Sequence, residues 1–170
     1  MKERKGVVTF AGSEVTLLGQ EAKVGEKAPD FTLTNQDLSQ FKFSETNGKI
    51  RLISIVPSLD TGVCSLQTRR FNEEASKIKD VQIITVSMDL PFAQARFCGA
   101  EGIKNMTVAS DYRDRDFGEK FGFLMKETML LARGIVIVDK DDTIKYVEYV
   151  PEVTNHVNYD KALEEAKKLA

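Results

Sequence analysis

IRLISIVPSLDTGVC, residues 50–64, gives the clearest indication of the fold class. Residues 50–56 are apolar and rich in β-branched side chains, which is typical of a strand buried on both faces. After the loop, apolar residues recur with helical spacing, and we expect a helix over residues 63–78 with a partly buried face. A buried strand that leads into a helix indicates an α/β domain.

Strands and helices continue on both sides of this stretch. We expect two short strands around a Gly12-Ser13 turn within residues 7–19, and an extended segment from Pro29. Further strands are predicted at 81–86, 106–109, 134–139 and 143–149, and further helices at 92–98, 116–121 and 158–169. This order predicts a thioredoxin-like three-layer sandwich, in which helices flank a mixed central sheet, with an N-terminal β-hairpin.

The bulk composition suits one domain that buries its own core. No repeat, low-complexity tract or linker interrupts the chain, so we predict a single domain over residues 1–170, with residues 1–20 as the hairpin extension. The net charge of −2 gives no reason to expect nucleic acid or an anionic membrane as partner. Apolar runs are strand-sized and none follows the basic N-terminus, so we expect a cytoplasmic chain without signal peptide or membrane span.

Two cysteines, Cys64 and Cys98, are the residues most suited to covalent chemistry. In a chain of this size without a secretion signal, redox chemistry explains a cysteine pair better than a structural disulfide does. The only histidine, His156, lies far from both cysteines in sequence. Such a set makes a poor zinc site, and we expect neither a metal nor a cofactor.

Cys64 is placed by this pattern in the first turn of its helix. Unpaired backbone N–H groups and the positive end of the helix dipole favour an anion there, so the thiolate form, the nucleophile, is stabilised. Thr61, or alternatively Asp60, is expected to cap the helix. The Thr61 hydroxyl is also suited to bonding a thiolate or a peroxide oxygen. Pro57, which lacks an N–H, is expected to stiffen the loop. It is also placed to shield the sulfur from solvent.

A wider set of motifs makes the chain resemble the peroxiredoxins, whose active-site signature is Pro, then Thr or Ser, then Cys at the spacing of Pro57, Thr61 and Cys64. It is most similar to the atypical two-cysteine subgroup, the thiol peroxidases. The similarity is carried by residues 57–64 with 70–72, 89–94 with Arg96 and Cys98, 110–111 with 117–118, and 130–133. Two departures are Met129, where the subgroup commonly has glycine, and residues 155–157.

The resemblance implies roles for five residues. Cys64 is the peroxidatic nucleophile, Cys98 the resolving thiol of the same chain, and Arg133 the cation that favours the thiolate and holds the peroxide; Thr61 and Pro57 complete the site. It further implies reduction of hydrogen peroxide and alkyl hydroperoxides through a sulfenic acid and an intramolecular disulfide, with thioredoxin as reductant. The expected assembly is a homodimer, and the expected role is antioxidant defence.

Two other functions stay open from the residues alone. A thiol–disulfide oxidoreductase on the same fold normally has Cys-x-x-Cys, whereas Ser65, Leu66 and Gln67 follow Cys64. A redox sensor that is not an enzyme would keep the same reactive thiol, and only turnover with a reductant separates the two. A cysteine hydrolase is disfavoured, because no motif surrounds His156.

Overall fold

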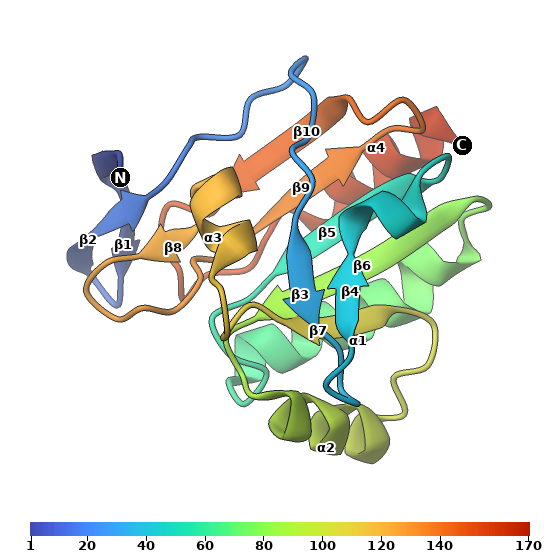
Figure 1. Cartoon of the computed structure of the whole chain (residues 1–170), viewed down its shortest axis with the longest axis horizontal. Coiled ribbons are helices and arrows are strands. Elements are labelled where there is room, and N and C mark those ends of the chain that lie inside the picture. Colours follow the sequence, from blue (N-terminus) through green and yellow to red (C-terminus); the bar gives the residue numbers. More distant parts are fainter.

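A seven-stranded sheet forms the centre of the computed structural model, which describes residues 1–170 (Figure 1). The strand order is β10-β9-β5-β6-β7-β3-β4. The parallel strands are β5 (Ile50–Ile55), β6 (Val81–Ser87) and β7 (Thr107–Ser110). Antiparallel strands complete both edges: β9 (Gly134–Val138), β10 (Ile144–Tyr149), β3 (Thr32–Thr34) and β4 (Gln40–Lys42). The predicted mixed sheet is confirmed.

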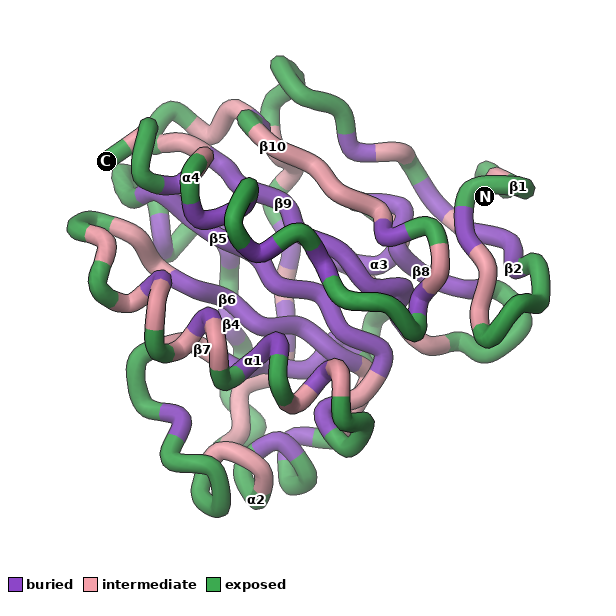
Figure 2. The backbone as a smooth tube through the Cα atoms, turned by 180° about the vertical axis from the view of Figure 1, so that it is seen from behind, coloured by how far each residue is buried: buried purple, intermediate pink, exposed green.

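Helices cover both faces of this sheet. The helices α1 (Gly62–Glu74) and α4 (Tyr159–Leu169) pack on one face, where Phe71 and Ala162 meet strand residues such as Leu52 and Ile137. Figure 2 shows these two helices in front of the buried strands. The short helix α3 (Asp116–Phe121) packs on the other face, and α2 (Pro91–Glu101) packs against β7. The predicted three layers are therefore present. None of the helices combines the length and apolar character needed to cross a membrane.

The N-terminal hairpin consists of β1 (Glu3–Phe10) and β2 (Ser13–Leu18). Its turn lies at Ala11 and Gly12, both with positive φ, rather than at Gly12 and Ser13 as expected. β8 (Leu124–Met125) pairs with β2 and makes a separate three-stranded sheet that the sequence did not predict. Val8, Val15 and Leu17 are buried in the larger of the two main apolar clusters, so the hairpin is packed onto the body of the molecule.

Other differences from the predicted elements are small. The α-helix α1 ends at Glu74, and a 3-10 turn, η2 (Ala75–Lys77), follows it. The second helix runs three residues beyond Cys98, to Glu101. The strand β4 and the 3-10 turn η1 (Phe43–Thr46) were not predicted. Met129 has a φ of 57°, in the left-handed region where glycine is most at ease, which explains why glycine suits that position.

Candidate active site

Cys64 lies in the first turn of α1, directly under the helix cap. Thr61 is the N-cap, and its Oγ1 accepts a hydrogen bond from the Cys64 backbone N–H at 3.3 Å. The Cys64 side chain is fully buried, whereas Thr61 is exposed. Pro57, which follows β5 in the chain, is buried. Strand β5 therefore delivers a rigid loop, and the start of α1 presents the thiol at its positive end.

Asp89 fixes the loop that precedes Cys64. Its carboxylate accepts hydrogen bonds from the Ser58 hydroxyl at 2.7 Å, the Leu59 backbone N–H at 2.8 Å and the Ser87 hydroxyl at 2.7 Å. These bonds join the ends of the adjacent strands β5 and β6. Sequence reasoning assigned Asp89 no such role, because its loop partners Ser58 and Leu59 lie 31 and 30 residues away in sequence.

Arg133 meets Cys64 from the opposite side. It immediately precedes β9, its side chain is buried, and its Nη2 donates to Cys64 Sγ at 3.0 Å. Nη1 donates to Gln67 Oε1 at 2.9 Å, and Nε donates to the Val153 carbonyl at 2.7 Å. A guanidinium at this distance, away from water, stabilises negative charge that develops on the sulfur. Three separate partners fix the plane of the guanidinium.

Gln67 is a site residue that the sequence analysis did not identify. Its Oε1 accepts from Arg133, and its Nε2 donates to the Ser54 hydroxyl at 2.8 Å. The side chain is fully buried between β5 and α1. The signal that points to it is its spacing: three residues after Cys64 on a helix, Gln67 faces the same way as the thiol.

Cys98 lies on α2 and borders the small apolar cluster that contains Cys64. Its sulfur accepts a weak hydrogen bond from Gln36 Nε2 at 3.4 Å. Burial raises the pKa of the Cys98 thiol, and the Gln36 bond offsets only part of that effect. Both cysteines are free thiols in the structure. The structure therefore brings both Thr61 and Arg133 into contact with Cys64 and leaves Cys98 on a neighbouring helix.

His156 has a partner other than a cysteine. Its Nδ1 lies 3.0 Å from the Tyr159 hydroxyl, which also sits near the site: burial raises the pKa of Tyr159, while the charges of Arg133 and Arg70 act to lower it. The cysteine–histidine pair of a hydrolase is thus not formed. No group of three or more His, Cys, Asp or Glu side chains is arranged to hold a metal ion.

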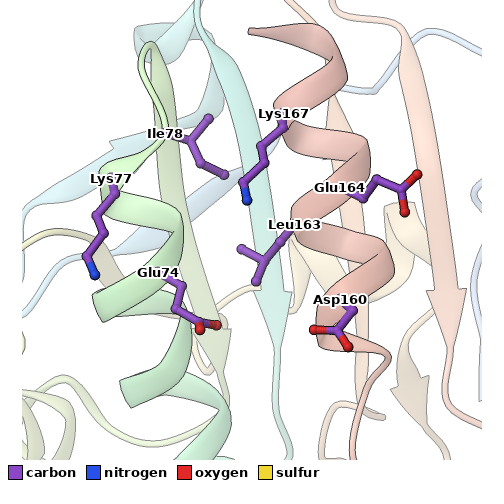
Figure 3. Close-up of a pocket in the computed structure, with 7 residues that line it drawn as sticks. All are labelled: Glu74, Lys77, Ile78, Asp160, Leu163, Glu164 and Lys167. Atoms are coloured by element: carbon purple, nitrogen blue, oxygen red, sulfur yellow. The ribbon is translucent and has the colours of Figure 1, made fainter.

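A separate surface groove lies between the end of α1 and α4 (Figure 3). Charged side chains of both signs rim it, with Glu74 and Lys77 on one side and Asp160, Glu164 and Lys167 on the other. Neither Cys64 nor Cys98 lines this groove.

The family model described as Redoxin matches residues 23–163 of the chain. The thiol peroxidase of Bacillus subtilis (strain 168) is 54% identical over 162 residues, covering 95% of this chain and 97% of that protein. The thiol peroxidase of Oceanobacillus iheyensis is 53% identical, covering 95% and 98%.

Solved structures agree with these matches. A peroxiredoxin-like protein from Aquifex aeolicus superposes with a TM-score of 0.91 at 42% identity, covering 98% of this chain and 99% of that one. A thiol peroxidase from Chromobacterium violaceum, at 21% identity, shares the fold with a TM-score of 0.85 and covers 96% and 98%. The chain therefore belongs to the Redoxin family, in its thiol peroxidase branch.

Proposed function

We propose that this peroxidase reduces hydrogen peroxide and alkyl hydroperoxides with Cys64 as the attacking thiolate. The Cys64 sulfur attacks one peroxide oxygen, the O–O bond breaks, and the other oxygen leaves with a proton as water or an alcohol. Cys64 becomes a sulfenic acid. Arg133 and Thr61 hold the peroxide oxygens and stabilise the charge that moves onto the leaving oxygen, and Pro57 shields the sulfur from solvent.

One observation carries this proposal: the 3.0 Å contact between Arg133 Nη2 and Cys64 Sγ. A buried arginine needs anionic or strongly polar partners, and beside the oxygens of Gln67 and Val153 the third partner here is the thiol at a helix N-terminus. A cysteine with only a packing role would gain nothing from a buried cation. The arrangement suits a thiolate that reacts by nucleophilic attack.

The second half of the proposed cycle uses Cys98. Its thiol attacks the Cys64 sulfenic acid, a disulfide forms and water leaves; a dithiol of the thioredoxin type then reduces the disulfide by exchange. α2 is suited to local unwinding that brings the sulfurs together, because only Pro91 and Gln94 of its residues are buried. The antioxidant role, the single-domain organisation, the homodimer and the cytoplasmic location stay predictions of the sequence.

Peroxide-dependent oxidation of reduced thioredoxin by the purified protein tests the function. The wild type should turn over many equivalents, and Cys64→Ser should lose all but a few per cent of the rate while keeping its circular dichroism spectrum. Cys98→Ser should react once and accumulate a sulfenic acid, visible by mass. Oxidation of the wild type by one equivalent without turnover would instead support the redox sensor.

A further inference from the structure

We propose that the N-terminal hairpin holds Arg133 against Cys64, and that Glu152 is the positioning residue through which it does so. The inference rests on the proposed function, since it concerns the geometry of the same site. It assigns a catalytic purpose to the hairpin β1–β2, which lies beyond the central sheet (Figure 1).

The backbone carbonyl of Val153 fixes the Arg133 guanidinium. Of the three hydrogen bonds of the guanidinium, the shortest, at 2.7 Å, runs from Nε to the backbone oxygen of Val153. Val153 does not belong to a helix or to a strand of the sheet. Its carbonyl therefore keeps its place only if something else holds the segment of residues 151–154.

The hairpin supplies that hold. The backbone N–H of Thr9 donates to the Pro151 carbonyl at 2.7 Å, and the backbone N–H of Val153 donates to the Thr9 carbonyl at 2.8 Å. Residues 151–153 thus lie beside strand β1, joined to it by backbone hydrogen bonds in a parallel bridge between Thr9 and Glu152. This pairing fixes the backbone position of Val153, whose carbonyl accepts the hydrogen bond from Arg133.

The Glu152 carboxylate closes the connection. It accepts from the Thr9 hydroxyl at 2.8 Å, from the turn N–H groups of Ala11 at 3.1 Å and Gly12 at 2.8 Å, and from the Thr154 N–H and hydroxyl at 2.8 and 2.6 Å. The bonds from Thr154 foremost, and those from Gly12 and Thr9, hold the pKa of this carboxyl well below its usual range.

These contacts link the hairpin turn to the residues on both sides of the Glu152 peptide. The Val153 carbonyl shares a peptide plane with the Thr154 N–H, which the Glu152 carboxylate holds, so release of that N–H would let the plane rotate and swing the carbonyl away from Nε. The guanidinium would then be free to turn about its remaining partners, and the Nη2 contact with Cys64 would be lost for part of the time. Misplacement of about 1 Å in a catalytic group is enough to slow a reaction greatly.

The test is a pair of matched carboxylate variants, followed by rapid mixing with hydrogen peroxide and alkylation of unreacted Cys64. Glu152→Ala should slow the first oxidation of Cys64 about fivefold or more, the rate equivalent of one hydrogen bond. Glu127→Ala should stay within about twofold of the wild type, because Glu127 holds Thr16 on the same hairpin and not the 151–154 segment. Closure of the disulfide, which does not involve Arg133, should keep its rate in both.

A double-mutant cycle separates positioning from general loosening. In the Arg133→Ala background, Glu152→Ala should have no further effect on the first oxidation, because the group it positions is gone. Additive effects, equal slowing by Glu127→Ala, or a wild-type rate in Glu152→Ala would each overturn the inference. If Glu152→Ala does not fold, Thr9→Val, which removes one of the five donors, is measured in its place. Failure of the wild type itself to consume peroxide would refute the proposed function instead.

Discussion

At the scale of single residues, the first prediction concerns Arg133 and its contact with Cys64. Its Nη2 donates to Cys64 Sγ, so in the proposed mechanism removal of the guanidinium takes away both the cation beside the attacking sulfur and the donors assigned to the peroxide. Arg133→Met should slow peroxide reduction at least about tenfold, or roughly 1.4 kcal/mol of barrier. Arg69→Met is the matched control, since Arg69 lies exposed on the same helix as Cys64. Equal rates for the two variants would contradict the role.

Thr61 makes a second residue-scale prediction that depends on one hydroxyl. This hydroxyl accepts the Cys64 backbone N–H and is exposed at the approach to the thiol. Thr61→Val keeps the shape and removes the hydroxyl, so we expect a loss of about tenfold or more in the rate of Cys64 oxidation. Thr61→Ser keeps the hydroxyl and should be much milder. Similar rates for Val and Ser would show that the hydroxyl is not used.

At the scale of elements, the resolving step depends on how easily α2 unwinds. Gly99 follows Cys98 inside this helix, and a Cβ added there meets no atom within 4 Å. Gly99→Ala should therefore strengthen α2 by about 1 kcal/mol without a clash. We expect the first oxidation of Cys64 to keep its rate and disulfide formation to slow about fivefold, with more sulfinic acid at high peroxide. Ala100→Gly, at the next position, should have the opposite effect on disulfide formation.

The elements also show what local pattern predicts. The strands β5, β6 and β9 were recognisable because each is rich in Ile and Val, as strands buried on both faces are. β4 has three residues and β8 has two, which is too short for a period to appear. β8 exists because Leu124 and Met125 pair with Leu18 and Leu17, a contact more than one hundred residues apart in sequence.

At the scale of the whole molecule, the residues of the site divide into those that local sequence pattern predicts and those that only the tertiary fold brings together. Thr61 and Cys64 were predictable because a helix cap and a first helical turn are local features. Placing Arg133 beside Cys64 depended on family resemblance, since sixty-nine residues separate them. The Val153 carbonyl and the Glu152 carboxylate were beyond reach, because a backbone acceptor has no sequence signal and its position follows from the packing of the N-terminal hairpin.

Asp111 gives a prediction for the stability of the whole fold. This carboxylate is 2% exposed and accepts the N–H groups of Phe117 at 3.0 Å and Gly118 at 2.8 Å, so it fastens α3 to the end of β7. Burial, above all, raises the pKa of Asp111 to about 7, and nearby acidic side chains add to the effect that its two N–H partners oppose. An unfolded aspartate titrates near 3.9.

Between about pH 4 and pH 7, the folded chain therefore holds a proton at Asp111 that the unfolded chain has lost. Rising pH then favours unfolding, and the contribution levels off above pH 7. The free energy of unfolding of the wild type should fall with pH relative to that of Asp111→Asn, by up to about 1.4 kcal/mol per pH unit inside this window. Urea titrations at half-unit steps measure it, with Asp114→Asn, an exposed change in the same loop, tracking the wild type. A difference between wild type and Asp111→Asn that stays constant from pH 4.5 to 8 would show that the carboxyl is ionised throughout, held by the N–H groups of α3 more strongly than burial penalises it.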